Sequence, residues 1–432
     1  MLPSLRSNLL MADSPDLFDS PDTPAAAATP PGLTAESIGD RPIASPVALK
    51  YLRLHLCPEV GSIRFGNLIR ELGGIDAVLR AAAGRLQSVT QVGPKTADRI
   101  ARHRDEVDVD MEVRLAGELG CRILCLADPE YPAILKMIDD PPPCLYYRGT
   151  LDRGDGLALA IVGSRRCSRY GAEQAERFAA LAVRAGMTVI SGLARGIDSF
   201  AHRGALKAGG RTLAVTGCGL AHVFPQEQEG LAGEIAANGA VISELPMTIP
   251  PDAKNFPPRN RIIAGLSLGV MVIEAAQRSG ALITARLAGE YNREVFAVPG
   301  PIDSPYAEGA NDLIRQGAAK LVMRMEDVLA ELGEAGALLM QAGQSDSSDP
   351  SGRSESPAQG GERINPPREH AVALTELQSR IVEAVAAGQR ALDDLCEVVG
   401  ETPGRIASQL ITLQLLGVVR RLPGEMYEAT RK

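Results

Sequence analysis

The chain has 432 residues, 45% apolar and 23% charged, which fits a globular protein of two or three domains. Its net charge of −8 argues against a wholesale polyanion binder, although residues 163–211 are locally basic. Seven cysteines without a C-x-x-C pair and five scattered histidines predict core thiols, a reducing cytoplasm and no metal site. With neither a signal-peptide core nor an apolar run of roughly 18 residues, we expect a cytoplasmic protein that does not engage a membrane.

The N-terminal part of the chain divides into a tail and a small helical domain. Residues 1–44 are rich in Pro, Ala, Ser, Asp and Thr, so we expect a disordered tail. Residues 45–120 show helical periodicity, and Leu86–Ile100 places a Gly-Pro-Lys hairpin between two short helices. This pattern is typical of a SAM-like or helix-hairpin-helix domain, whose hairpin amides can hold a DNA phosphate. A helical bundle that contacts other domains or proteins explains it equally well.

Residues 121–332 are predicted to form an α/β domain. Its first part, 121–150, is a Pro-rich connector with two candidate strands. Six short apolar runs bounded by glycine then alternate with helical stretches. Such runs joined by crossover helices predict an open, doubly wound, mainly parallel sheet. The predicted strands are 157–162, 187–191, 211–216, 240–243, 269–274 and 294–298.

The C-terminal part is predicted to be a linker followed by a winged-helix domain. Residues 333–370 are rich in Gly, Ser, Asp, Pro and Gln, as linkers are. Residues 371–432 contain three helical stretches and a strand pair, the winged-helix pattern. Arg405 is the only basic residue of the third helix, which favours contact with a partner or with the rest of the chain over DNA binding.

One stretch, 256–265, joins an aromatic ring and two guanidinium groups to the start of a helix. Its Pro-Pro pair predicts a stiff extended loop, with Asn260 capping a helix that begins at Arg261. This loop would hold Phe256, Arg259 and Arg261 at the edge of the sheet. In an alternative arrangement, one of the two arginines turns inward to brace Glu244 or Glu274.

Ligands of open α/β sheets lie beyond the carboxyl ends of the strands. The loops predicted there combine glycines, helix starts and cationic groups, which suits a flexible polyanion with a base stacked on Phe256. Without G-x-G-x-x-G or a P-loop, NAD and ATP are disfavoured and we expect no cofactor. Few side chains could read base edges, so sequence preference should be weak. The candidate DNA-binding residues are Gly163, Ser164, Arg165, Arg166, Ser191, Gly192, Arg195, Gly217, Lys254, Phe256, Arg259, Asn260, Arg261, Ser279 and Gly280.

A family resemblance covers about residues 125–325. YPAILKMIDDPPPCLYYRG, AIVGSRRCSRYG, VISGLARGIDSFAH, TGCG, FPPRNRIIAG, SGALITA and VFAVPG resemble, in this order, motifs of the DprA/Smf family of DNA-processing proteins. The resemblance implies an extended Rossmann-like domain that binds single-stranded DNA, usually as a homodimer. It also implies protection of incoming strands and loading of the recombinase RecA in natural transformation. Carried over by motif, the DNA pocket would comprise Gly163, Ser164, Arg165, Lys254, Phe256, Arg259, Asn260 and Arg261.

Two other functions are compatible with parts of the sequence. The first is an enzyme related to nucleoside-monophosphate phosphoribohydrolases, in which Glu244 or Glu274 would supply a carboxylate. The chain lacks the PGG-x-GT-x-x-E turn of those enzymes, and His202 is predicted to pack rather than to catalyse, so we assign no catalytic residue. The second is an adaptor in which the helical domains dominate.

Overall fold

The computed structural model describes residues 42–333, 335–337 and 339, and within 376–429 all residues except 389, 402–405, 407–408, 411–412, 414–417 and 423–425. The predicted disordered tail lies outside this part of the chain up to residue 41. Its last residues, 42–44, belong to the fold instead, because Ile43 O accepts a 2.8 Å hydrogen bond from Ile123 N. The predicted linker also falls almost entirely outside the described part. Leu339, however, is buried in the core of the α/β domain, so that domain extends beyond residue 332.

Six short helices form the N-terminal domain around a core that includes Leu52, Phe65, Leu68, Leu86 and Ile100. The two glycines that precede the second and fifth helices have the same backbone angles, φ −79° and ψ 171°. The helices are α1 (Pro46–His55), α2 (Ser62–Leu72), α3 (Ile75–Arg80), α4 (Ala83–Gln87), α5 (Pro94–Glu106) and α6 (Val109–Glu118).

The predicted helical hairpin between α4 and α5 has a second copy between α1 and α2. In each copy, a residue two positions before the glycine adopts a left-handed conformation: Glu59 at φ 67° and Gln91 at φ 65°. Only the copy between α4 and α5 was predicted, since the first hairpin lacks the Gly-Pro-Lys signal.

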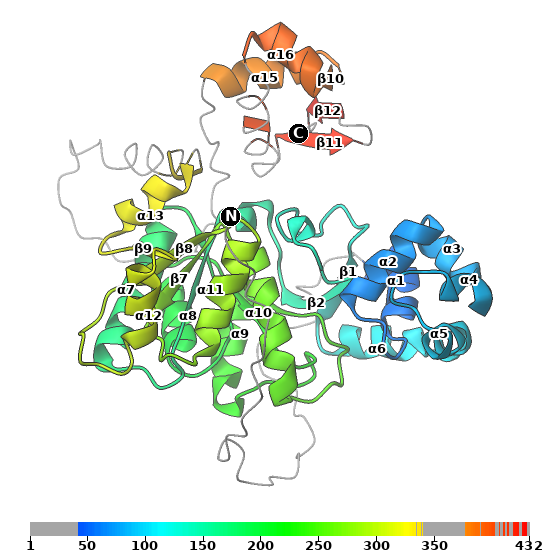
Figure 1. Cartoon of the computed structure of the whole chain (residues 1–432), viewed down its shortest axis with the longest axis horizontal. Coiled ribbons are helices and arrows are strands. Elements are labelled where there is room, and N and C mark those ends of the chain that lie inside the picture. Colours follow the sequence, from blue (N-terminus) through cyan, green and yellow to red (C-terminus); the bar gives the residue numbers. More distant parts are fainter. Residues whose placement is uncertain are drawn as a thin grey trace, which may run out of the picture. The chain divides into compact units, whose positions relative to one another are not determined.

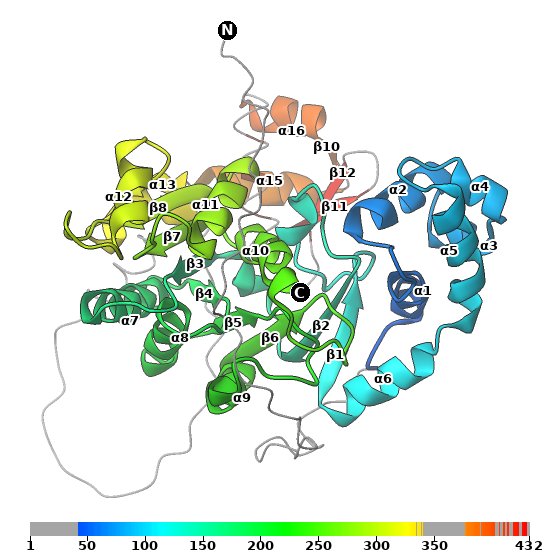
Figure 2. The ribbon, with the colours of Figure 1, turned by 60° about the horizontal axis from the view of Figure 1, so that its bottom comes forward.

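A nine-stranded sheet forms the core of the α/β domain, with the order β1-β2-β6-β5-β4-β3-β7-β8-β9, as Figure 2 shows for the labelled strands. The seven strands from β3 to β9 are parallel, whereas β2 is antiparallel to β6 and β1 is antiparallel to β2. The six predicted strands are confirmed as β3–β8, and the connector's two candidates as β1 and β2. The bounds are β1 (Cys121–Cys125), β2 (Cys144–Gly149), β3 (Ala158–Gly163), β4 (Thr188–Ser191), β5 (Thr212–Val215), β6 (Gly239–Ser243), β7 (Gly269–Ile273), β8 (Glu294–Val298) and β9 (Lys320–Leu321).

Helices cover both faces of this sheet, which explains why its strands are continuously apolar (Figure 1). One face packs against α7 (Arg169–Arg184), α8 (Ile197–Lys207), α9 (Glu229–Asn238) and α13 (Met325–Glu331). The other packs against α10 (Phe256–Gly265), α11 (Gly280–Glu290), α12 (Glu308–Arg315) and the 3₁₀ turn η2 (Leu135–Met137).

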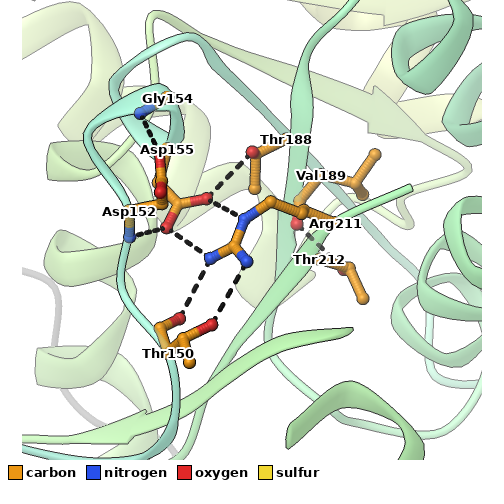
Figure 3. A network of polar contacts seen from close by, with 8 residues as sticks. All are labelled: Thr150, Asp152, Gly154, Asp155, Thr188, Val189, Arg211 and Thr212. Carbon is orange, nitrogen blue, oxygen red and sulfur yellow. Dashed lines mark hydrogen bonds and ion pairs between the residues drawn. The ribbon is translucent and has the colours of Figure 1, made fainter. Parts of the chain in front are cut away.

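At the amino ends of β4 and β5, a polar network ties the connector to the sheet (Figure 3). The Arg211 guanidinium donates to both carboxylate oxygens of Asp155, at 2.9 and 2.8 Å, and to Thr150 O at 3.0 Å. Asp155, in the 3₁₀ turn η3 (Arg153–Gly156), also accepts from the Thr188 hydroxyl at 3.0 Å. The bidentate pairing of Arg211 with Asp155 fixes the amino edge of the sheet at this point. The candidate site lies at the opposite, carboxyl edge.

The C-terminal residues form a small unit of α15 (Glu376–Ala386), α16 (Leu392–Val399) and a sheet with the order β10-β12-β11. Its strands are β10 (Arg390–Ala391), β11 (Val419–Leu422) and β12 (Met426–Ala429), the last two being the predicted strand pair. Arg405 and most of the predicted third helix lie outside the described residues. Throughout the described chain, no helix is long and apolar enough to span a bilayer.

Candidate nucleic-acid interface

The loops that follow the parallel strands meet at the carboxyl edge of the sheet. Ser164 N, after β3, donates to the Glu274 carbonyl oxygen after β7 at 2.7 Å. Ser164 O in turn accepts from Ile197 N, at the start of α8, at 3.2 Å. After β5, Thr216 N donates to Ile242 O of β6 at 2.8 Å. The loops in which the candidate residues were predicted thus form one continuous edge.

Glu274 holds the loop between β3 and α7 in place. Its carboxylate accepts hydrogen bonds from the Ser168 amide, at 2.7 Å, and from the Ser168 hydroxyl. That hydroxyl also caps α7 by accepting from Gly171 N at 3.1 Å. Gly171 has to be a glycine because a Cβ there would collide with the Glu274 carboxylate. The hydrogen bonds between Glu274 and Ser168 fix the loop between β3 and α7, in which the Arg165 side chain is exposed.

The Phe256 ring is half-buried at this edge, with groups from several loops around it. The Arg165 guanidinium carbon lies 5.4 Å from the ring centroid and that of Arg259 lies 5.8 Å away. A Cβ on Gly217 would be only 2.9 Å from the ring, so a glycine after β5 is needed for the ring to lie there. Phe256 is thus held by packing against neighbouring loops, while part of its ring stays open.

The start of α10 differs from the prediction. The helix begins at Phe256, so the two prolines occupy its first turn and not an extended loop. This is possible because first-turn amides have no partner within the helix, and proline lacks that amide. Asn260 lies inside the helix, where it donates to Gly280 O at 3.4 Å, and does not cap it.

Arg259 is buried and points beneath the surface. Its guanidinium donates to Gly192 O at 2.7 Å and to Val215 O, which ties α10 to the ends of β4 and β5. Burial lowers the pKa of Arg259 to about 10, and the Asp198 carboxylate opposes this shift. Gly192 permits the arrangement, since a Cβ there would lie 2.7 Å from the guanidinium. Arg259 was predicted to contact DNA. In the structure it instead supports the site by holding α10 against the ends of β4 and β5.

Arg261 is also buried, and it points away from Arg259. Its guanidinium lies 3.0 Å from the Asp140 carboxylate and 2.5 Å from that of Glu244. The same group donates to the hydroxyl of Ser62, at the start of α2, at 2.9 Å. The alternative in which one arginine braces Glu244 describes Arg261. Arg259 also turns inward, but it binds backbone oxygens at the strand ends and neither Glu244 nor Glu274. Neither guanidinium is available to a phosphate.

The cationic candidates that remain are exposed. Arg166 forms no ion pair with any residue that the structure describes, and its backbone amide donates to the Ser164 hydroxyl oxygen at 3.2 Å. Arg195 pairs with Glu227, and Lys254 with Asp252 at 2.8 Å. Ion pairs this exposed contribute little stability, so a phosphate can replace the carboxylate.

Four smaller candidates differ in accessibility. Ser191 is fully buried and its hydroxyl donates to Ile161 O at 2.6 Å, so the prediction that it contacts DNA is wrong. Gly163 is required by packing, because a Cβ would collide with the backbone of β7. Ser279 caps α11 by accepting from Ala281 N at 3.2 Å, while Gly280 beside it is exposed. No group of three possible metal ligands occurs among the described side chains.

Phe224 lies beside Phe256 and was not among the predicted candidates. It lies half-buried after β5, with its ring centroid 5.7 Å from that of Phe256. A Phe-Pro pair inside the polar run HVFPQEQE, in a chain with only seven phenylalanines, was the signal available.

Comparison with known proteins identifies the family. The model of the family described as "DNA recombination-mediator protein A" matches residues 122–333, and that of the "DprA winged helix domain" matches residues 365–425. Protein Smf of Synechocystis is 34% identical over 385 residues, which are 85% of this chain and 95% of that protein. The chain belongs to the DprA/Smf family. Its α/β domain and winged-helix tail are therefore those of a DNA recombination mediator.

Other DprA/Smf proteins agree with this assignment. Protein Smf of Escherichia coli is 40% identical over 300 residues, covering 69% of this chain and 75% of that protein. The crystal structure of DNA processing protein A (DprA) from Streptococcus pneumoniae is 34% identical, with a TM-score of 0.59. That match covers 65% of this chain and 97% of the other, and it confirms the predicted fold class.

Proposed function

We propose that this DprA/Smf protein binds single-stranded DNA along the carboxyl edge of its sheet. The observation that carries the proposal is the half-open Phe256 ring beside the exposed Arg165 guanidinium, 5.4 Å from the ring centroid. A single strand offers both an unpaired base and a phosphate within such a distance, whereas a duplex keeps its bases stacked inside. Stacking of a base on an aromatic ring contributes about 1–3 kcal/mol.

The side chains that we expect to bind DNA are the candidates that are exposed or half-buried. Arg165, Arg166, Arg195 and Lys254 supply positive charge, and Phe256 supplies the stacking surface. Few side chains at this edge could read base edges, so we expect sequence preference to be weak. No cofactor takes part in this proposal.

The biological role that we infer is that of the family. The protein protects incoming single strands and loads RecA onto them in natural transformation, acting as a homodimer. The support for this inference is membership of a family of DNA recombination mediators.

A phosphoribohydrolase activity finds less support in the site. Glu274 already accepts two hydrogen bonds from Ser168, and Glu244 is paired with Arg261. Burial raises the pKa of Glu244, yet its carboxylate is paired with Arg261, which also binds Ser62 of the helical domain. Release of free base from AMP would favour this alternative.

The test is a binding titration of single-stranded and duplex DNA across a salt series. Single strands should bind more tightly than duplex, with a log–log salt slope of roughly −0.7 per phosphate contact. Equal affinity for the two forms, or an affinity independent of salt, would contradict the proposal.

A further inference from the structure

Two of the partly open phenylalanine rings contact each other at the site. Among the described phenylalanines, Phe65, Phe178 and Phe296 are fully buried. Phe224 and Phe256 are only half-buried, and their ring planes are inclined by 45° at a centroid distance of 5.7 Å. Two adjoining, partly exposed rings, one of them beside the Arg165 guanidinium, offer flat apolar surface to more than one base.

The loop that carries Phe224 is fixed before the ring. Gly219 N donates to Ile249 O at 2.8 Å and Ala221 N donates to Met247 O at 3.1 Å. A Cβ on Gly219 would collide with the Pro246–Met247 backbone, so the two segments lie in close contact.

The same loop is also fixed after the ring. Pro225 is buried, and the amide group of Gln228 donates to the Ser199 hydroxyl at 2.8 Å. The neighbouring Glu227 forms the ion pair with Arg195. The Phe224 ring is therefore presented at a set position relative to Phe256, with a cationic group from the next loop close to its own segment.

We propose that Phe224 is a second stacking surface, so that the site takes two neighbouring nucleotides of a single strand, with one base on each ring. This inference rests on the proposed function and deepens it. Since the rings are inclined by 45°, two bases lying on them cannot stack in parallel on each other, and the strand is unstacked at that step. The phosphates on either side are within reach of Arg165, next to Phe256, and of Arg195, once it leaves Glu227.

The first experiment compares Phe224→Leu and Phe224→Ala with the wild-type full chain in a titration of a short oligothymidylate. Leucine keeps apolar packing against Phe256 but has no aromatic face. Both variants should lose about 5- to 150-fold in affinity, with an unchanged salt slope because no charge is removed. Thermal unfolding of both variants shows whether the fold is kept. Phe200→Leu, at a half-buried ring on α8, is the matched control and should bind as the wild type does.

A second experiment separates base stacking from mere support of Phe256. In an oligonucleotide with two adjacent 2-aminopurines, unstacking on binding should raise the fluorescence, and Phe224→Leu should abolish most of that rise. Phe224→Leu should also weaken binding when Phe256 is already leucine. Wild-type affinity in Phe224→Leu, or no added loss in the double variant, would overturn the inference while leaving the proposed function intact. Failure of the wild type to bind single strands would instead overturn the proposed function.

Discussion

Two arginines lie at similar distances from the Phe256 ring but in different surroundings. The guanidinium carbons of Arg165 and Arg259 are 5.4 and 5.8 Å from its centroid, yet Arg165 is exposed and Arg259 is 5% exposed. Replacing each by alanine removes the same charge. The two variants should therefore separate phosphate binding from support of the site.

Arg165→Ala should weaken binding of single-stranded DNA and make the log–log salt slope shallower by about 0.7, because one phosphate contact is lost. Its free energy of unfolding should stay within about 0.5 kcal/mol of the wild type, as for other surface changes. A salt titration and a urea unfolding curve measure the two effects. An unchanged slope would remove Arg165 from the DNA interface.

Arg259→Ala should destabilise the fold by about 3 kcal/mol or more. The change leaves Gly192 O and Val215 O without their donor, and it removes the guanidinium that, more than that of Arg165, favours the buried Asp198 carboxylate. Chemical unfolding measures the loss, and near-wild-type stability would contradict the assigned support role.

The inward direction of both arginines could not be predicted from the sequence because it depends on where α10 begins. When the Pro-Pro pair is taken as a loop, Arg259 stands outside the helix. In the structure Arg259 and Arg261 are two residues apart on one helix, so their side chains point about 160° apart around the helix axis. One reaches the strand ends and the other reaches Ser62, a contact between segments far apart in sequence.

At the scale of elements, the two helical hairpins of the N-terminal domain share one turn geometry but have different tasks. The first hairpin leads into Ser62, whose hydroxyl is bound by Arg261 of α10. In the second, Gly93, Pro94 and Lys95 are exposed. The first hairpin thus contacts another domain, whereas DNA binding by the second stays a prediction.

The left-handed residues of these turns give a prediction about stability. Gln91, at φ 65°, is exposed, and its backbone oxygen accepts from Arg64 at 3.0 Å. Gln91→Gly should stabilise the domain by up to about 1 kcal/mol, because glycine adopts this φ without the steric cost of a Cβ. Gln91→Ala keeps a Cβ and is the control, with a smaller change expected. Urea unfolding compares them, and a glycine variant less stable than the alanine variant would contradict the argument.

The matching residue of the first turn should respond differently. Glu59, at φ 67°, accepts hydrogen bonds from Thr96, at 3.2 Å, and from Arg99, and both would be lost in Glu59→Gly. The relief of backbone strain is then offset, so that this variant should not gain stability.

At the scale of the whole molecule, the parallel sheet could be predicted and its surroundings could not. Continuous apolar strands between glycines are specific to a sheet covered on both faces, which is why β3–β8 were found nearly residue for residue. The pairing of β2 with β6, and the packing of the helical domain against β1 and β2, depend on contacts distant in sequence. Local patterns carry no information about them.

Two buried histidines, His55 and His202, should make the folding stability depend on pH. His55 of α1 lies with its Nε2 2.9 Å from Glu244 O, and His202 of α8 shares a 2.7 Å hydrogen bond with the Thr212 hydroxyl. Burial lowers the pKa of His55 to about 4 and that of His202 to about 3. Because Thr212 donates its own proton to Val189 O, the Nδ1 of His202 is the donor in that pair.

Folding stability should fall as the pH is lowered through the unfolded pKa of histidine, about 6.5. Below that pH the unfolded chain binds protons that the folded chain excludes, so each histidine should cost about 2 kcal/mol between pH 7 and pH 5. The loss continues down to the folded pKa values of about 4 and about 3. His202→Asn keeps a donor for the Thr212 hydroxyl but cannot titrate, so its unfolding free energy should change less over this interval than that of the wild type. Urea unfolding at both pH values measures the difference, and a variant that keeps the full wild-type pH dependence would show that His202 is protonated equally in the folded and unfolded states.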